Sequence, residues 1–371
     1  MAWVAGDMPP TVARPSWRMR LAKLAAKPSF QRWSARFPLT RTHVRKEGEA
    51  LFDLVQGFVA SQVLRALIEL RLLHRAMDGP LDPRALSGPL EIRADRLAQL
   101  LQAGAALGLL RRNRDRFEIT TRGAALLGVP GLEGMIRHHD VLYRDLADPV
   151  ALLRGQVDTE MVGFWPYVFG GAAGDPDTAR LYSGLMSDTQ GLVAEDTLDA
   201  VSLSDVTHLM DVGGGHGTFA KAVAARYPRL ALTVLDLPVV VDGAPDLPGI
   251  TFRSGSFRDA ALPADSGADA ISLIRVLYDH DDDTVRDLLR KARAALPAGG
   301  RIIISEPMSG GAEPDRACDV YFAFYTMAMR TGTVRSAARI SELLDAAGFA
   351  ATRRHASRRP FVTQLVEARR A

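Results

Sequence analysis

The sequence predicts an α/β protein in which a Rossmann-like, parallel doubly wound sheet follows an N-terminal helical module of winged-helix type. Three observations lead to this fold class. Apolar strands and amphipathic helices alternate from residue 205 onward, helices followed by a β-wing occupy residues 47–121, and a glycine-rich turn at 211–217 joins a strand to a helix. The chain has 371 residues, of which 47% are hydrophobic and 24% charged, which is enough for roughly two domains.

Residues 1–46 form a basic, amphipathic arm. They carry ten Lys or Arg residues and a single acid, Asp7. Aromatic and aliphatic side chains stand between the charges, a mixture that suits the interface of an anionic bilayer. The arm is therefore expected to make peripheral contact with a membrane, or else to be a flexible tail or an arm exchanged within a dimer.

Residues 47–134 have the pattern of a winged-helix-like domain, because apolar residues recur at spacings of three and four before a short two-stranded pattern. The predicted elements are helices at 47–75, after 80–86 and at 94–107, then a wing over 109–121 with a basic turn at 111–116. Such modules bind DNA in repressors. Beside a cofactor domain they more often dimerise the chain and cover the substrate, so no nucleic-acid partner is expected.

A helical connector over residues 135–200, with a helix at 182–198, leads into the sheet domain over 201–371. The alternation of apolar runs and helical patterns in that domain predicts parallel strands. Strands are expected near residues 207, 231, 250, 268 and 301, helices near 218, 240, 284, 316 and 339, and a closing antiparallel pair at 351–355 and 361–367.

The turn Asp211–Gly217 is the strongest functional signal. Glycines at 213, 215 and 217 allow positive φ and a close backbone approach to a ligand at a helix N-terminus. A dinucleotide-binding turn would need a glycine at the sixth position from Gly213, where Thr218 stands. Alternate glycines after an acidic residue are instead typical of enzymes that bind S-adenosylmethionine, with Asp211 facing the ammonium side of that ligand.

Asp236 ends the next predicted strand, where a carboxylate can accept hydrogen bonds from both ribose hydroxyls. Leu237 would then cover the adenine. Together with the turn, this pair predicts an S-adenosylmethionine site. The competing interpretation is a glycine-rich turn that holds no ligand.

Five segments carry a resemblance to a known family. They are Asp211–Gly217, Asp236-Leu237-Pro238, Arg275–Asp282, Ile302–Pro307, and Arg335-Ser336 before Ala347-Gly348-Phe349. In this order they resemble the plant-caffeate-type family of S-adenosylmethionine-dependent O-methyltransferases over roughly residues 46–371. The resemblance implies a class I methyltransferase sheet with an N-terminal winged-helix dimerisation domain, a homodimer, and methyl transfer by direct displacement without a metal.

The catalytic segment departs from that family. Tyr278 stands where the resemblance implies a histidine base, and Glu306 matches the carboxylate that orients the base. An ordinary tyrosine is a poor base at neutral pH, so Tyr278 is expected to orient the substrate hydroxyl. His280 could be the base if its ring turns inward, or it could be an exposed loop histidine. The family's second glutamate falls at Val334 and is absent.

The resemblance also implies further cofactor contacts. Ser256 stands where many relatives carry an aspartate on the adenine side, and Phe257 can still pack against the ring. Arg275 lies where relatives hold a polar residue near the methionyl part, with a surface salt bridge as the alternative. Glu306 beside Pro307 could likewise have only a structural role at the start of a helix.

The sequences of three segments resemble those of the purple-bacterial hydroxycarotenoid O-methyltransferases: residues 275–280, 317–329 and 30–40. This implies transfer of a methyl group to the tertiary 1-hydroxyl of an acyclic hydroxycarotenoid. The predicted substrate contacts are Met186, Tyr325, Met327 and Met329, an aromatic and thioether set that could equally be core. The alternatives are an O-methyltransferase for a polyketide, phenolic or other pigment hydroxyl, and a non-catalytic regulator that senses S-adenosylmethionine.

Composition bounds the remaining possibilities. The single cysteine, Cys318, excludes an internal disulfide and is expected to be a small buried hydrophobe. The adjacent pair His138 and His139 is not expected to point into one helix-borne metal site. The N-terminal segment has no signal-peptide h-region and no apolar run is long enough for a membrane span, so we expect a cytoplasmic protein, with the arm's contact at the inner or photosynthetic membrane left open.

Overall fold

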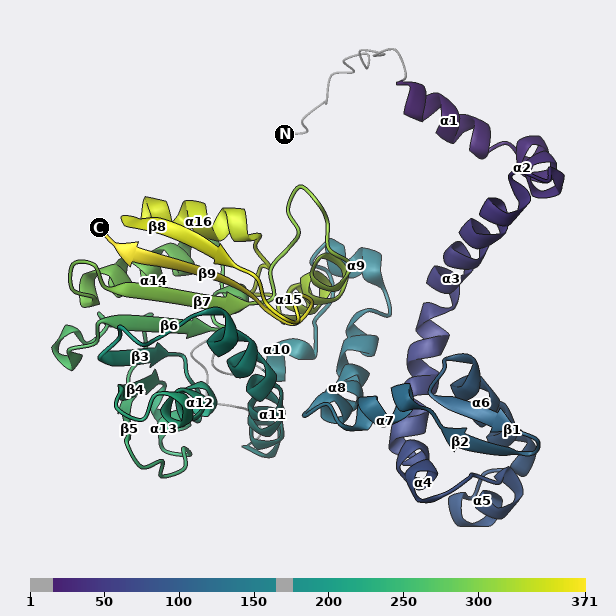
Figure 1. The fold of residues 1–371 in the computed structure, drawn as a ribbon, viewed down its shortest axis with the longest axis horizontal. Helices are drawn as coiled ribbons and strands as arrows, with labels where there is room; N and C mark the ends of the chain where they lie inside the picture. Colours follow the sequence, from purple (N-terminus) through teal and green to yellow (C-terminus); the bar gives the residue numbers. More distant parts are fainter. Residues whose placement is uncertain (1–15, 165–175) are drawn as a thin grey trace, which may run out of the picture.

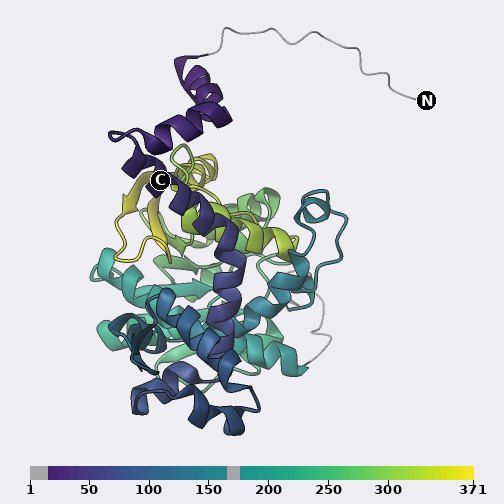
Figure 2. The same cartoon turned by 90° about the vertical axis from the view of Figure 1, so that its right-hand side faces the viewer.

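The computed structural model describes residues 16–164 and 176–371, except for the side chains of 164 and 176–187. Figure 1 shows an N-terminal helical module beside a larger α/β domain, with a helical arm rising from the module. The arm consists of α1 (Trp17–Ala25) and α2 (Pro28–Arg36), followed by the long α3 (Arg41–Glu69). Figures 1 and 2 show α1 and α2 at the far end of α3, away from the end that packs into the module.

The first long helix begins and ends earlier than the periodicity predicts. The sequence predicts a helix over 47–75, whereas α3 ends at Glu69 and α4 (Leu72–Asp78) follows. The chain turns between them because Arg71 adopts a left-handed conformation with φ of 53°. By length and composition alone α3 could cross a membrane, which the sequence interpretation did not expect, and little of its most apolar stretch is buried.

The N-terminal module confirms the predicted helices and wing. Its remaining elements are α5 (Pro83–Leu90), α6 (Ala94–Ala106), β1 (Leu110–Asn113), β2 (Arg116–Ile119) and α7 (Thr121–Leu127). The two strands pair antiparallel, with Leu110 opposite Ile119. Leu67, Leu101 and Phe117 are buried in one core that joins α3, α6 and the wing.

The described part of the connector between the module and the sheet domain contains α8 (Leu132–Asp145), α9 (Pro149–Leu153), α10 (Met161–Phe164) and α11 (Pro176–Ala200). Val141 and Leu142 of α8 pack with Met161 of α10 and with Tyr325, Ala328 and Met329 of the sheet domain. The connector therefore lies against the sheet domain rather than hanging between two separate bodies.

The C-terminal domain confirms the predicted doubly wound sheet. Its seven strands lie in the order β5-β4-β3-β6-β7-β9-β8, in which β3 to β7 are parallel and the pair β8 and β9 is antiparallel. The strands are β3 (His208–Val212), β4 (Ala231–Asp236), β5 (Ile250–Ser254), β6 (Ala270–Ile274), β7 (Arg301–Glu306), β8 (Phe349–His355) and β9 (Gln364–Arg370). All residues of β6 and β7 are buried, because helices cover both faces of a parallel sheet.

The helices divide between the two faces of the sheet. The helical elements are α12 (Thr218–Arg226), α13 (Pro238–Val241), α14 (Asp282–Ala295), η3 (Ala317–Phe322), α15 (Ala323–Met329) and α16 (Ala337–Ala346). Side chains of α14 and α16 form one core with the sheet, and those of α11 and α12 form the other. The alternation of strand side chains explains this division, since Met210 faces the first core and Leu209 the second.

The last strand lies three residues beyond its predicted position. The sequence predicts it at 361–367, but its pairing with β7 places Val366 opposite Ile304. Phe361 consequently falls in the preceding turn, where its side chain is 58% exposed. Cys318 is fully buried as expected, and burial raises the pKa of its thiol to about 12.

Candidate active site

The glycine turn lies where the strand order reverses, between the carboxyl ends of β3 and β6. Ligands of open α/β sheets bind in the crevice at such a point. Gly213, Gly215 and Gly217 all have positive φ, of 70°, 58° and 77°. A Cβ at Gly213 would lie 3.0 Å from the Val276 side chain, so the turn is tightly packed against the segment that follows β6. The space beside Gly215 is open, which leaves its backbone accessible to a ligand.

Asp236 ties the turn to the end of β4. Its Oδ2 accepts a hydrogen bond from the Gly215 N–H at 2.7 Å, and its Oδ1 accepts one from the Leu237 N–H at 2.7 Å. Burial raises the pKa of Asp236, whereas the two N–H donors lower it. Each oxygen of an ionised carboxylate keeps a second lone pair, so Asp236 can still accept from ribose hydroxyls.

Asp211 lies beneath the turn, on β3. Its Oδ1 accepts a hydrogen bond from the Ser272 hydroxyl at 2.6 Å, and its Oδ2 has no hydrogen-bond partner among the described residues. A Cβ at Gly214 would lie 2.5 Å from that Oδ2. Burial raises the pKa of Asp211 to about 7. An ammonium group above the turn would favour the charged form, so the turn, Asp211 and Asp236 together fit S-adenosylmethionine.

His280 lies on the predicted adenine side. Its ring packs edge-on against Phe257 at 5.3 Å between centroids, and its Nδ1 lies 2.9 Å from an Arg258 guanidinium nitrogen. The side chain is only 8% exposed, so the alternative of an exposed loop histidine is wrong. Burial, followed by the charge of Arg258, lowers the pKa of His280 to about 4. Ser256 accepts a hydrogen bond from the Arg258 N–H at 3.2 Å, at the start of the same loop.

Glu306 holds the backbone of the catalytic segment rather than a side chain. The segment forms a 3₁₀ turn, η2 (Leu277–Asp279), and Glu306 Oε2 accepts from the N–H groups of Leu277 at 2.9 Å and Tyr278 at 3.1 Å. Glu306 Oε1 is buried without a hydrogen-bond partner among the described residues. Burial raises the pKa of Glu306 to about 7 and also raises the pKa of the buried Tyr278 phenol.

Arg335 is a positioning residue that the sequence did not reveal. Its guanidinium donates to the carbonyl oxygens of Leu277 and His280, both at 2.8 Å, and to Asp282 Oδ1 at 2.7 Å. These bonds fix both ends of η2. The pair Arg335-Ser336 belongs to the segments quoted for the family resemblance, but nothing in the sequence alone indicates that its arginine reaches back 55 residues.

Arg275 reaches the connector helix α11. It has a positive φ of 59°, which is uncommon for a residue with a side chain, and its guanidinium donates to Thr189 Oγ1 of α11 at 3.0 Å. Its charge lowers the pKa of both Tyr278 and Asp279 against the larger effect of their burial. Arg275 therefore links η2 to the connector helix that borders the site.

The predicted substrate wall contains a polar cluster. His138 Nε2 of α8 lies 3.1 Å from the Tyr325 hydroxyl, and His139 Nε2 lies 2.8 Å from the Tyr321 hydroxyl. The two adjacent histidines thus meet different tyrosine hydroxyls, which stand four residues apart in the chain. Burial lowers the pKa of both histidines, that of His138 to about 4.

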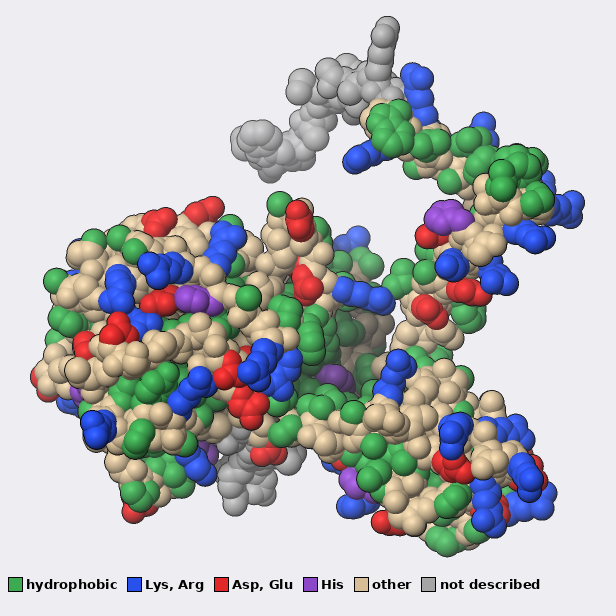
Figure 3. Space-filling view, in the orientation of Figure 1, with side chains coloured by type: hydrophobic (Ala, Val, Ile, Leu, Met, Phe, Trp, Pro, Cys, Tyr) green, Lys and Arg blue, Asp and Glu red, His purple; other side chains and the backbone are tan. Residues whose placement is uncertain are grey.

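Tyr325 and Met329 are buried in the core that joins α8, α10 and α15, and Met327 is half-buried. Met186 lies on α11, but its side chain is outside the described residues. Figure 3 shows a hollow on this side of the molecule, between the α/β domain and the helices of the connector, with hydrophobic side chains on its visible walls. The substrate roles of these residues stay predictions.

Comparison with known proteins gives matches over almost the whole chain. The O-methyltransferase domain family matches residues 143–350, and the O-methyltransferase dimerisation domain matches residues 52–128. The chain is 54% identical to demethylspheroidene O-methyltransferase of Cereibacter sphaeroides over 93% of each chain. It is 53% identical to the enzyme of that name in Rhodobacter capsulatus, over 90% of this chain and 85% of the relative. Human N-acetylserotonin methyltransferase, solved in complex with SAM, has the same fold, with a TM-score of 0.71 and 24% identity over 88% of this chain and 98% of that one.

Proposed function

Because this chain belongs to the O-methyltransferase family and is an S-adenosylmethionine-dependent enzyme, we propose that its substrate is the tertiary 1-hydroxyl of an acyclic hydroxycarotenoid. The observation that carries this proposal is the identity with two demethylspheroidene O-methyltransferases at more than half of the aligned positions. The aromatic and thioether side chains of α15 suit contact with a long apolar substrate.

When bound, S-adenosylmethionine supplies an electrophilic methyl group. The residues of the chain then have to bind the methyl donor, align the substrate hydroxyl with its methyl group, and exclude water. Asp236 and the glycine turn hold the donor, and Glu306 with Arg335 fixes the turn η2 beside it. A tertiary alcohol is a very weak acid, so alignment should contribute more than early proton removal, and oriented reactions gain roughly 7–11 kcal/mol.

The test is product mass spectrometry with methyl-labelled S-adenosylmethionine. The purified enzyme is offered a panel of acyclic hydroxycarotenoids and, separately, a panel of phenols and aromatic polyketides. We expect a labelled methoxy group on a carotenoid with a tertiary 1-hydroxyl. Methylation of phenols with no carotenoid product would favour the alternative acceptor class and overturn the proposal.

We further propose that the chain acts as a homodimer through α3. Around its middle, α3 exposes an apolar row that the other described residues leave uncovered: Leu51, Phe52, Val55, Phe58 and Val59, each between 48% and 72% exposed. A contiguous exposed row of this kind marks an interaction surface. A second copy is the occupant we favour, since the dimerisation-domain match begins at residue 52.

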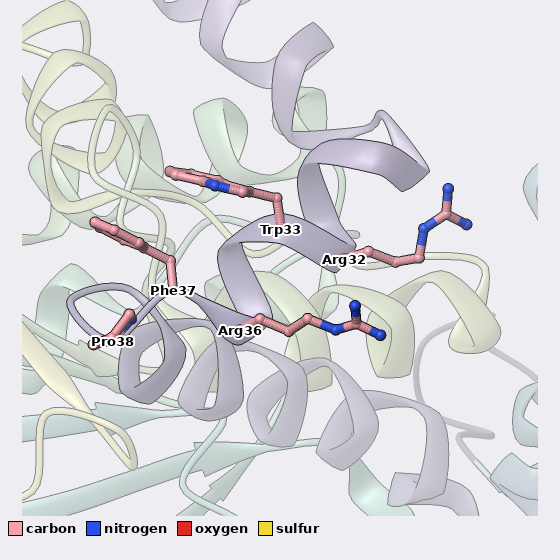
Figure 4. Close-up of a pocket in the computed structure, with 5 residues that line it drawn as sticks. All are labelled: Arg32, Trp33, Arg36, Phe37 and Pro38. Carbon is pink, nitrogen blue, oxygen red and sulfur yellow. The ribbon is translucent and has the colours of Figure 1, made fainter.

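We also propose that the arm docks the enzyme on an anionic membrane. Figure 3 shows hydrophobic and basic side chains side by side along α1 and α2. On α2 a groove of about 440 Å³ is lined by Arg32, Trp33, Arg36, Phe37 and Pro38. Trp33 and Phe37 stack at 5.0 Å between ring centroids, and Figure 4 shows their rings on one side of the helix and the two guanidinium groups on the other.

This division of side chains supports a membrane contact. Trp33 is 53% exposed and Trp17 of α1 is 67% exposed, so both indoles can enter the headgroup region without unfolding anything. Arginines near the surface each add about 1 kcal/mol of attraction to anionic lipid. A peripheral location on the inner or photosynthetic membrane, for an otherwise cytoplasmic enzyme, would bring the active site to a substrate that dissolves in the bilayer.

A further inference from the structure

The three residues predicted to be catalytic are poorly placed to take a proton from the substrate. The Tyr278 phenol is buried and its pKa is raised, so it stays protonated. The Nδ1 of His280 faces Arg258 on the adenine side, and burial makes this ring a weak base. Glu306 accepts two backbone N–H groups of η2 and holds the turn.

Asp279 is the remaining carboxylate of this segment. It ends η2, and its Oδ1 is buried without a hydrogen-bond partner among the described residues. The residue as a whole is nevertheless partly accessible to solvent, whereas this oxygen is shielded from it. An unpartnered buried carboxylate oxygen is costly, and such an atom is expected to meet a donor when the substrate binds.

The backbone around Asp279 is held on several sides. The Thr333 N–H donates to the Tyr278 carbonyl oxygen at 2.9 Å. The Arg335 guanidinium donates to the carbonyl oxygens of Leu277 and His280, the residues before Tyr278 and after Asp279. A Cβ at Gly332 would lie 3.2 Å from the Cα of Asp279 and 2.2 Å from the Tyr278 carbonyl oxygen, so the covering loop fits closely. Asp279 is thus fixed in position before any substrate arrives.

The turn that carries Asp279 lies between the donor site and the substrate wall. Val276 touches Gly213 of the glycine turn, and η2 packs against α15. A hydroxyl that reaches the donor from the side of α15 therefore passes this turn. Glu306 Oε1 also lacks a hydrogen-bond partner among the described residues, but Glu306 is 0% exposed, whereas Asp279 is partly accessible.

Three ionisable groups face Asp279. Burial raises its pKa well above the usual range, the Arg275 guanidinium lowers it, the Glu306 carboxylate raises it, and the Tyr278 hydroxyl lowers it. A raised pKa makes this carboxylate a stronger base than an ordinary aspartate, which is the direction that general-base catalysis favours.

We propose that Asp279 accepts the proton of the substrate hydroxyl, an inference that rests on the proposed function. As the substrate oxygen forms a bond to the methyl carbon, the carbon–sulfur bond breaks and its electron pair stays on sulfur. The hydroxyl proton passes to a carboxylate oxygen of Asp279. The sulfonium loses its positive charge while Asp279 becomes neutral, so charge and atoms balance.

The test compares the full-length enzyme with Asp279→Asn, Asp279→Glu and the control Asp283→Asn, an aspartate whose side chain is 93% exposed. We expect kcat of Asp279→Asn to fall roughly 10²- to 10⁴-fold, the range of general-base catalysis, with unchanged calorimetric affinity for S-adenosylmethionine. The acid limb of the pH–rate profile should disappear in Asp279→Asn and persist in Asp279→Glu at a lower rate. The control should behave as the wild type.

A second readout needs no turnover. Infrared difference spectra against pH should show the protonated carboxyl band of Asp279 in the wild type and lack it in Asp279→Asn, whatever the acceptor substrate is. A wild type that methylates hydroxycarotenoids alongside an Asp279→Asn variant with the same rate and pH profile would overturn the inference. A wild type that methylates only phenols, with the titrating band present, would overturn the proposed function alone. If Asp279→Asn does not fold, loss of the acid limb in Asp279→Glu would overturn the inference.

Discussion

Replacing Asp236 is the sharpest test of the donor site. Its carboxylate accepts the N–H groups of Gly215 and Leu237 and, by our assignment, the ribose hydroxyls. Asp236→Ala removes all of these acceptors at once. Asp236→Asn is more informative because it keeps the shape but turns one oxygen into an NH₂ group, which must face a backbone N–H or a ribose hydroxyl.

The expected magnitude follows from the bonds that are lost. A hydrogen bond to a charged group contributes about 1.5–3 kcal/mol, which corresponds to roughly a 10- to 150-fold change in Kd. Loss of the Gly215 contact also loosens the turn, so the larger end of this range is expected for both variants. Titration calorimetry with S-adenosylmethionine and with S-adenosylhomocysteine measures the effect directly.

The matched control is Asp246→Asn, an exposed aspartate beyond α13. It should leave Kd unchanged. Circular dichroism and thermal unfolding show whether each variant keeps its fold. A Kd for Asp236→Ala within twofold of the wild type, in a folded protein, would refute the assignment of Asp236 to the ribose.

Four further outcomes are expected. Tyr278→Phe and His280→Ala should each retain measurable turnover, and a loss of about 10⁴-fold in His280→Ala alone would instead indicate a committed base. Burial raises the pKa of Glu306 from 4.5 to about 7 in the folded protein, so its contribution to stability is present at acidic pH and is lost as pH rises from about 4.5 through 7. The free energy of unfolding in urea of the wild type, relative to that of Glu306→Gln, should therefore fall over that pH range. A difference that stays constant with pH would contradict the raised pKa. A protein shortened to begin at Lys46 should keep its cofactor affinity but lose salt-sensitive co-sedimentation with anionic vesicles, whereas equal sedimentation would favour an arm exchanged within the dimer. Phe58→Asp should give a monomer by light scattering, and an unchanged mass would place the interface elsewhere.

The fold could be predicted from sequence wherever local patterns decide it. The strand, glycine turn and helix around Gly213 depend on adjacent residues, and strands such as β7 are continuous apolar runs because both faces are buried. The position of β9 could not be read in this way, since its register is set by pairing with a strand about 60 residues earlier in the chain. The left-handed conformation of Arg71, which ends α3, could not be predicted either, because arginine has no preference for it.

The site was predictable to the level of segments and no further. The ring of His280 is placed by Arg258, 22 residues away, and His139 is placed by Tyr321, 182 residues away. No spacing rule contains such pairs, because they arise only when loops at the ends of different strands come together. The same holds for Arg335, because its positioning role depends on three hydrogen-bond acceptors that lie near it only in the folded chain.

Under the proposed function, these placements account for a tyrosine at position 278, where the family resemblance implies a histidine. Where a ring would need a carboxylate to orient it, Glu306 here accepts two backbone N–H groups, and Arg335 holds the carbonyl oxygens of the same turn. The polar groups are thus used to fix geometry. The hydroxyl of a tertiary alcohol becomes acidic only as its oxygen takes the methyl group, so the base is needed late in the step, when the new bond is forming. A rigid turn that aligns the oxygen, with one carboxylate beside it to take the proton late, suits this acceptor better than a histidine does.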